Sequence, residues 1–296
     1  MRSVLGDRKA LVILLGPALL LYTLIMLVPI VWSFVYAFLT GNAFEGYEFA
    51  GIDNFARLFE DSHVQNALGF TIRYAAVLTI GQVGIGYALS LLYAFVLRRG
   101  SGFVRTLVFF PIVLPTVAVA LLYQKLFQSA PRDGIVNALL VNIGLPSVDW
   151  LGSADTAFIV VVVLDIWRTM GFYGVLLYAG LLDIPEEMLE SARLDGARGW
   201  ALFRYIILPL SLPILLSSLI FSLNGTLKVF DSIYALTGGG PGEGTTPLTL
   251  YMYRTAFAYN DYGYGSAIAI VLTMLCLLVT VAIFRSARRD LTAARR

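Results

Sequence analysis

The sequence predicts an all-α integral membrane protein with six transmembrane helices, and three observations support this class. Hydrophobic residues make up 58% of the 296 residues, and the mean hydropathy is +0.80, which is too apolar for a soluble domain of this size. Long apolar runs alternate with shorter polar connections. Lysine and arginine gather on alternate connections. We therefore expect residues 1–296 to form a single transmembrane domain.

Six apolar runs along the chain are each long enough to cross a bilayer. The first follows a basic N-terminus and lacks a convincing cleavage site, which favours an uncleaved span over a signal peptide. The predicted spans are about 10–39, 70–97, 104–127, 156–182, 205–236 and 264–284. Prolines lie inside three of them and are expected to bend the first span and to kink the entry to the fifth. These are Pro17 and Pro29 in the first span, Pro111 and Pro115 in the third, and Pro209 and Pro213 in the fifth.

The basic residues predict the orientation of the spans. Most of the flanking positive charge lies at the two termini and on two of the connections. These residues are Arg2, Arg8, Lys9, Arg98, Arg99, Arg105, Arg193, Arg198, Arg204, Arg285, Arg288, Arg289, Arg295 and Arg296. By the positive-inside rule, both termini and the connection 183–204 should face the cytoplasm.

A polar segment, residues 183–213, lies between the fourth and fifth spans. Asp183 and Glu186 have the spacing of a capping box, which predicts the start of a short helix. Gly196 follows an aspartate and supplies a helix stop, because glycine readily adopts the left-handed conformation just past a helix end. A second helix is expected to restart near Arg198 and to enter the fifth span. On composition alone, this segment could equally be a solvated loop.

The spacing of the small residues in this segment favours a specific role over that loop. Glu190-Ser191-Ala192, then Gly196, then Ile206 and Leu208-Pro209 resemble the EAA motif of the membrane subunits of binding-protein-dependent ABC importers. Ser191 stands where the first alanine of the motif is usual. The resemblance implies a type I importer permease fold in which the coupling loop 183–204 docks on the ATP-hydrolysing subunit. The implied coupling residues are Glu187, Glu190, Ser191, Ala192, Asp195, Gly196 and Ala197.

Further strings resemble the carbohydrate permeases of this family. They are WRTMG (167–171), AGLLDIP (179–185), DGA (195–197), FD (230–231), LTGGGP (236–241) and YRTAF (253–257). The resemblance implies a bacterial inner-membrane subunit that pairs with a second permease, an ATPase dimer and an extracytoplasmic solute-binding protein. It also implies a carbohydrate substrate, namely a sugar, oligosaccharide, polyol or glycerol phosphate. Gly239, Gly240 and Pro241 are the implied contact with the binding protein.

Four charged residues lie inside the predicted spans: Asp165 and Arg168 in the fourth, and Lys228 and Asp231 in the fifth. Each costs about 2.5–3.5 kcal/mol at the centre of a membrane helix, so each should face a partner or a polar cavity. The spacing of three residues allows an ion pair within each helix, and a polar pathway for solute is the alternative. Asn224 is expected on the face of Lys228 and Asp231. The predicted pathway residues are Asp165, Trp167, Arg168, Asn224, Lys228, Asp231 and Tyr234.

The sequence also excludes several kinds of function. It has no G-x-x-x-x-G-K-[ST] phosphate loop, so we expect a partner subunit to bind ATP and Mg²⁺ and the chain itself to need no cofactor. His63 is the only histidine and Cys276 the only cysteine, which argues against a metal site. A net charge of +2 gives no reason to expect nucleic acid. The alternatives are an importer of a non-sugar solute, an ion-coupled secondary transporter using Asp165 and Asp231, and an intramembrane enzyme.

Overall fold

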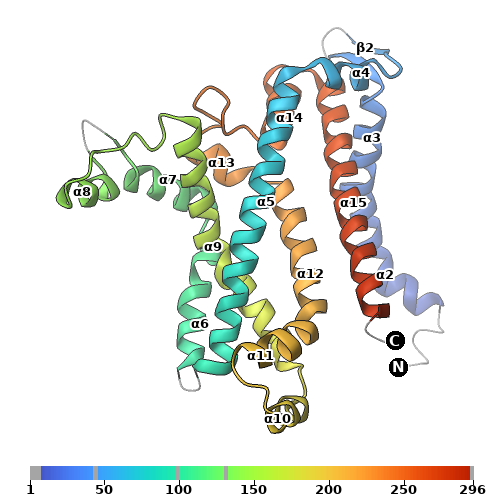
Figure 1. Cartoon of the computed structure of the whole chain (residues 1–296). Coiled ribbons are helices and arrows are strands. Elements are labelled where there is room, and N and C mark those ends of the chain that lie inside the picture. The colour runs from blue at the N-terminus through green and yellow to red at the C-terminus, as the bar shows by residue number, and fades with distance from the viewer. Residues whose placement is uncertain (1–7, 43–45, 98–99, 130–132, 294–296) are drawn as a thin grey trace. The chain divides into compact units, whose positions relative to one another are not determined.

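The computed structural model gives the chain's fold in two compact units (Figure 1). The described residues are 8–42, 46–97, 100–129 and 133–293. One unit comprises residues 1–64 with 251–271, and the other comprises residues 65–250 with 272–296. Each unit is described by itself below.

Helices dominate the described residues, as the sequence predicts. Five are long and apolar enough to cross a membrane: Lys9–Tyr36, Ser62–Val96, Ala154–Leu182, Trp200–Leu227 and Tyr262–Arg285. A sixth crossing is formed if the bent pair Ser101–Val113 and Thr116–Leu126 is one broken span. The membrane class and the helical architecture are therefore confirmed within the described part of the chain.

The larger unit contains most of these helices, numbered as in Figure 1. They are α5 (Ser62–Leu91), α6 (Ser101–Phe109), α7 (Thr116–Leu126), α8 (Ile135–Asn142), α9 (Ala154–Leu182), α10 (Glu186–Leu194), α11 (Trp200–Leu202), α12 (Leu208–Leu227) and α13 (Asp231–Leu236). A core of aliphatic and aromatic side chains joins α5, α7, α9 and α13. Burial of that core fixes the two short helices α7 and α13 against the long ones.

The third predicted span, 104–127, is not one helix. A 3₁₀ turn over Phe110–Val113 follows α6, and α7 then leaves at 95° to it. Leu114 is extended, with ψ of 141°, because the ring of Pro115 disfavours a helical conformation for the residue before it. The two prolines therefore turn the chain rather than merely bending a continuous helix.

The fifth predicted span, 205–236, is also interrupted. Helix α12 ends at Leu227, and α13 begins only at Asp231. The side-chain amide of Gln124 on α7 donates hydrogen bonds to the carbonyls of Ala235 (3.0 Å) and Leu236 (2.7 Å), which satisfies the open end of α13. This distant contact stabilises a separate short helix where sequence periodicity alone predicts continuation.

Two prolines inside spans each follow a wider, π-helical turn. One turn covers Thr23–Leu27 and precedes Pro29, and the other covers Phe203–Ile207 and precedes Pro209. A proline has no N–H to donate, and its ring clashes with the preceding turn of an α-helix. Widening that turn relieves both problems while the helix continues.

The polar segment forms a helix, but not with the predicted cap. Helix α10 begins at Glu186 with Pro185 at its N-cap and no side-chain cap, while Asp183 closes the C-terminus of α9. The capping-box prediction is therefore wrong, because α9 continues to Leu182 and leaves Asp183 in its own last turn. The predicted stop is confirmed, since Gly196 has a φ of +89° and its N–H donates to the carbonyl of Arg193 (3.1 Å).

The smaller unit contains α2 (Arg8–Tyr22), α3 (Val28–Tyr36), α4 (Asp53–Glu60) and the start of α15 (Tyr262–Ala293). It also contains an antiparallel hairpin, β1 (Leu39–Asn42) with β2 (Gly46–Phe49), which the sequence did not predict. The amide of Asn54 donates to the carbonyls of Ala37 (3.0 Å) and Leu39 (2.8 Å), so α4 is tied to the start of the hairpin.

Asp61, between α4 and α5, is a hydrogen-bonding centre of the smaller unit. Its carboxylate accepts the hydroxyl protons of Tyr251 and Tyr264, each at 2.7 Å, and the backbone N–H of His63 at 2.9 Å. Burial alone would raise the pKa of Asp61, but the hydrogen bonds from the two tyrosines and from backbone amides outweigh it and lower that pKa. The ionised form of Asp61 is therefore the one that the fold stabilises.

Replacing Asp61 with asparagine is expected to lower the free energy of unfolding by about 1.5–3 kcal/mol at neutral pH, the usual contribution of hydrogen bonds to a charged group. Because the folded-state pKa of Asp61 lies below its unfolded value, this stabilisation is present at neutral pH and is lost as pH falls through the folded-state pKa. Thermal unfolding of the purified chain should show that the difference in stability between the variant and wild type becomes smaller as the pH is lowered. Glu60→Gln, at an exposed neighbouring position, is the control. Equal effects of the two variants would contradict this role for Asp61.

Candidate functional site

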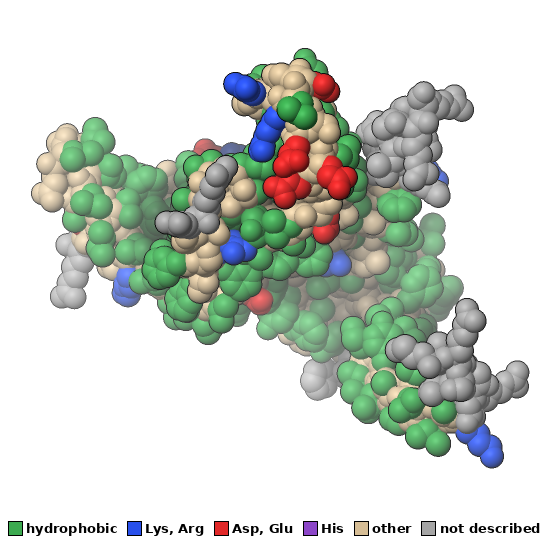
Figure 2. All heavy atoms as spheres, turned by 90° about the horizontal axis from the view of Figure 1, so that it is seen from below, with side chains coloured by type: hydrophobic (Ala, Val, Ile, Leu, Met, Phe, Trp, Pro, Cys, Tyr) green, Lys and Arg blue, Asp and Glu red, His purple; other side chains and the backbone are tan. Residues whose placement is uncertain are grey.

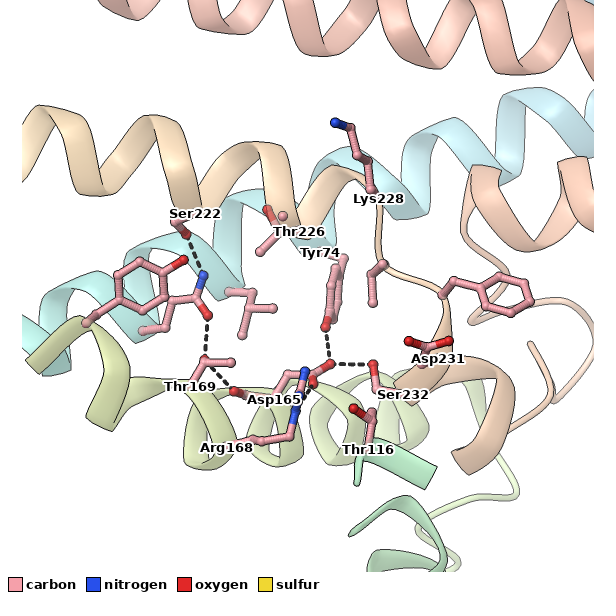
Figure 3. Close-up of a pocket in the computed structure, with 16 residues that line it drawn as sticks. Tyr74, Thr116, Asp165, Arg168, Thr169, Ser222, Thr226, Lys228, Asp231 and Ser232 are labelled. Carbon is pink, nitrogen blue, oxygen red and sulfur yellow. Dashed lines mark hydrogen bonds and ion pairs between the residues drawn. The ribbon is translucent and has the colours of Figure 1, made fainter. Parts of the chain in front are cut away.

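The larger unit encloses a polar cavity of about 240 Å³ between α5, α7, α9, α12 and α13 (Figure 3). This volume equals roughly eight molecules of liquid water at about 30 Å³ each. The polar residues that line it are Tyr74, Gln82, Thr116, Asp165, Arg168, Thr169, Tyr173, Ser222, Thr226, Lys228, Asp231 and Ser232. They come from separate parts of the chain, and the cavity exists only because the broken spans bring them together.

Asp165 is the most buried charged residue of this cavity wall, with 3% of its surface exposed. Its Oδ2 accepts hydrogen bonds from the hydroxyls of Tyr74 and of Ser232, the latter at 2.6 Å. Its Oδ1 lies 3.5 Å from Nε of Arg168, so the predicted ion pair within α9 is confirmed. Among the described residues, neither that Oδ1 nor that Nε has a hydrogen-bond partner. Both atoms are almost completely shielded from solvent, and they face each other across this ion pair.

A second polar chain crosses the cavity wall from α9 to α12. Thr169 donates to the side-chain oxygen of Gln82 (2.6 Å), and the amide nitrogen of Gln82 donates to Ser222 (2.5 Å). Ser222 in turn donates to Thr79 (2.9 Å). Sequence reasoning missed these residues, as it missed Tyr74 and Ser232, because uncharged polar groups are common in membrane helices. The only signal in the sequence was their position inside apolar spans.

Lys228 and Asp231 line the cavity but do not form the predicted ion pair. Lys228 follows the last residue of α12, and Asp231 opens α13, so the two are not on one helical face. Figure 3 shows the Lys228 ammonium group pointing away from Asp231. The prediction of a self-neutralising pair is wrong, because it assumed an unbroken helix through residues 228–230.

The three other predicted pathway residues lie outside the cavity lining. Asn224 donates to Thr280 (2.8 Å) and to its own helix at the carbonyl of Ile220 (2.9 Å). The rings of Trp167 and Tyr123 have centroids 6.0 Å apart, within the packing of the core. Tyr234 stacks on Phe230, with centroids 5.3 Å apart. Asn224 therefore does not line the cavity beside Lys228 and Asp231.

The predicted coupling loop is exposed over most of its length. Figure 2 shows acidic and basic side chains gathered on this segment, beside helices covered by hydrophobic side chains. Glu187, Glu190, Ser191, Asp195 and Gly196 are exposed, and Ala197 is half-buried. Ala192 is buried instead, in a cluster with Leu181, Ile184, Leu202 and Ile207. The small size of Ala192 therefore serves packing inside the chain. Leu194 is 89% exposed and presents an apolar side chain to the surroundings.

The connection after α13 is a non-helical loop, as its run of glycines predicts. Gly238, Gly239 and Gly242 all have positive φ, which residues with a side chain rarely adopt. The hydroxyl of Thr246 donates to the carbonyl of Gly239 (2.9 Å), and that of Thr245 donates to the carbonyl of Gly240 (2.6 Å). These bonds hold Gly239, Gly240 and Pro241 in one defined turn. Within the described ranges, no group of three or more His, Cys, Asp or Glu residues could hold a metal ion.

Comparison with known proteins places these features in one family. Residues 83–289 match the family described as the binding-protein-dependent transport system inner membrane component. The chain is 35% identical over 205 residues to the trehalose/maltose transport system permease protein MalF of Thermococcus litoralis, which covers 68% of each chain. It is 33% identical over 245 residues to the lactose transport system permease protein LacF of Rhizobium radiobacter, which covers 80% of each chain.

Solved structures share the fold. A crystal structure of a bacterial ABC transporter involved in the import of the acidic polysaccharide alginate contains a chain with a TM-score of 0.84 and 24% identity. The match covers 97% of this chain and 98% of that one. The chain therefore has the same fold as that transporter chain.

Proposed function

The chain belongs to the family of binding-protein-dependent transport system inner membrane components, and on that premise we propose that it forms part of the translocation pathway of an ATP-driven carbohydrate importer. Relatives that are 33–35% identical are named for trehalose, maltose and lactose. The chain has no phosphate loop of its own, so the energy must come from a partner. The proposed partners are a second permease, an ATPase dimer that binds ATP and Mg²⁺, and an extracytoplasmic solute-binding protein.

The observation that carries the proposal is the polar cavity beside Asp165. A sugar ring offers several hydroxyl groups, each of which can donate and accept hydrogen bonds. The Asp165–Arg168 ion pair places an acidic and a basic side chain together at one wall. Lys228 and Asp231 add further charged groups at the break between α12 and α13. Polar side chains that converge on one concave site are what orients a small-molecule ligand and gives specificity.

The proposed mechanism is alternating access driven through the coupling loop. With the termini and residues 183–204 in the cytoplasm, α10 is within reach of an ATPase subunit. Its exposed residues Leu194, Glu187 and Glu190 offer one apolar and two acidic contacts to that subunit. Because α9 leads directly into α10, movement of α10 is transmitted to Asp165 and Arg168 on α9. The loop at Gly239, Gly240 and Pro241 is the proposed contact for the loaded binding protein.

Replacing Lys228 with methionine is expected to raise the substrate concentration for half-maximal uptake by about tenfold. The reason is that a hydrogen bond to a charged group contributes about 1.5–3 kcal/mol, and about 1.4 kcal/mol corresponds to tenfold. Uptake of labelled sugars by the reconstituted transporter measures this change. Lys125→Met, on an exposed position of α7 outside the cavity lining, is the matched control. Identical kinetics for both variants would place the substrate elsewhere.

The same reconstituted transporter separates the competing functions. Uptake that stops on ATP depletion and continues with an uncoupler supports the ATP-driven importer. Uptake that survives ATP depletion and stops with an uncoupler indicates an ion-coupled transporter instead. A panel of sugars tested against amino acids and other small solutes decides the substrate class.

A further inference from the structure

We propose that residues 134–148, here called the apolar arm, are an anchor that lies in the interface of the bilayer. The arm contains helix α8 and the turn after it, and it projects sideways from α7 in Figure 1. Its sequence, GIVNALLVNIGLPSV, has no charged residue. This inference concerns the connection between α7 and α9 and is independent of the substrate and of the coupling loop.

The side chains of the arm expose hydrocarbon to its surroundings. Leu139 is 61% exposed and Ile143 is 72% exposed, although both are large aliphatic residues. Ile135, Val141 and Leu145 are also exposed. Ile135, Leu139 and Ile143 are spaced four residues apart and therefore follow one helical stripe. An uncharged surface of this kind needs an apolar environment.

The polar groups of the arm are largely satisfied from within. Asn137 is fully buried, and its amide donates to the carbonyls of Gln128 (3.2 Å) and Val148 (2.9 Å). Its side-chain oxygen accepts the N–H of Val148 (3.1 Å) and the indole N–H of Trp150 (3.0 Å). At the end of α8, the N–H of Leu145 donates to the carbonyl of Leu140 (2.9 Å). Internal pairing of this kind is what a hydrocarbon environment requires.

Charged residues border the arm and mark a polar edge. Asp133 accepts the hydroxyl proton of Ser147 (3.0 Å), and Asp149 accepts that of Ser129 (2.9 Å). The edge that carries Asp133 and Asp149 is thus polar and hydrogen-bonded, while the exposed side chains of the arm, apart from Asn142 and Ser147, are apolar. This division is typical of a segment that lies in a bilayer interface. Because the arm has no basic residue, its attraction to lipid is hydrophobic rather than electrostatic.

The apolar arm continues the exposed hydrocarbon surface of the neighbouring span. Val117, Leu121 and Leu122 on α7 are at least half exposed, and α7 belongs to the bent span. Figure 2 shows hydrophobic side chains on the projecting arm and on the helices beside it, with a basic side chain near their junction. The surface that faces lipid on α7 therefore extends along the arm, which favours lipid over a protein partner as the neighbour of the arm.

The arm packs closely against the end of α7. A side chain at Gly134 would place its Cβ 2.4 Å from the carbonyl oxygens of Lys125 and Leu126, so the chain passes directly against the end of α7. Trp150 packs edge-on against Phe127, with ring centroids 5.4 Å apart. An anchor attached in this way holds α7 at a fixed depth, and α7 packs against α13 at the cavity.

A spin label at position 139 tests the proposal. Leu139→Cys is made in a Cys276→Ala background, and the chain is purified with its partner subunits and reconstituted in phosphatidylcholine vesicles. The label should collide with oxygen, which concentrates in hydrocarbon, more than with a water-soluble nickel chelate. A label at Leu121→Cys, on the span surface, should also collide more with oxygen than with the nickel chelate. A label at Ser147→Cys, at the polar edge, should collide more with the nickel chelate. Adding phosphatidylglycerol should leave all three results unchanged.

Two results would overturn the proposal. Greater collision with the nickel chelate at position 139 would place the arm in water. Low collision with both reagents would show that a protein covers the arm, namely the second permease or the binding protein. The position is exposed and outside the core, so the label leaves the packing of the chain intact.

Discussion

Replacing Asp165 with alanine is expected to lower the free energy of unfolding by about 3–5 kcal/mol, because removal of one member of a buried ion pair leaves the other uncompensated. The Arg168 guanidinium would lose its only ion-pair partner among the described residues, and the hydroxyls of Tyr74 and Ser232 would lose their shared acceptor. These contacts join α5, α9 and α13, so the loss affects the whole cavity wall. Thermal unfolding of the purified chain in detergent measures the change.

Two further variants separate charge from packing at this position. Asp165→Asn keeps the shape and the acceptor but removes the charge, and it should be less destabilising than alanine. The double variant Asp165→Leu with Arg168→Met removes both charges and should recover much of the lost stability, because well-packed apolar residues often replace a buried pair without loss. The interpretation is wrong if the double variant is as unstable as Asp165→Ala.

Replacing Gly196 with valine is expected to reduce substrate-stimulated ATP hydrolysis of the assembled transporter by about tenfold or more, given that strained backbone conformations cost about 1–3 kcal/mol. Gly196 has a φ of +89°, which a β-branched residue strongly disfavours. A Cβ at this position would meet no atom within 4 Å, so the effect comes from the backbone and not from a steric clash. The strain would displace the turn after α10, and with it the proposed coupling surface.

The matched control is Gly196→Asn, because asparagine tolerates the left-handed conformation. It should retain most of the stimulated hydrolysis, while valine should not. Co-purification of the ATPase with each variant separates failed assembly from failed coupling. Equal activity of the two variants would show that the geometry of this turn does not matter for coupling.

Where a prediction depended on apolar run length or on local spacing, the structure mostly agrees with it. The Asp165–Arg168 ion pair forms because both residues lie in the unbroken helix α9, where a spacing of three brings side chains together. The helix stop at Gly196 forms because it requires only that this one glycine adopt the left-handed conformation. The capping box failed for a local reason as well, since Asp183 is the C-cap of α9 and Pro185 is the N-cap of α10.

The site was harder to predict, because its residues meet only through contacts distant in sequence. Lys228 was assigned to a continuous helix, but Gln124 on α7 stabilises α13 as a separate element. Tyr74 and Ser232 carry no charge and no motif, yet they surround Asp165. Their role follows from how α5 and α13 pack against α9, and no local pattern specifies that packing.

The sequence by itself determined the membrane class, the family and the position of the proposed coupling loop, since each depends on hydrophobicity or on spacing within one segment. Tertiary structure alone decided where the spans break, which polar groups line the cavity and which charged residues pair. The physical reason is that hydrophobic burial selects helices without specifying their neighbours. Hydrogen bonds and ion pairs between helices form only after packing has brought their partners within reach.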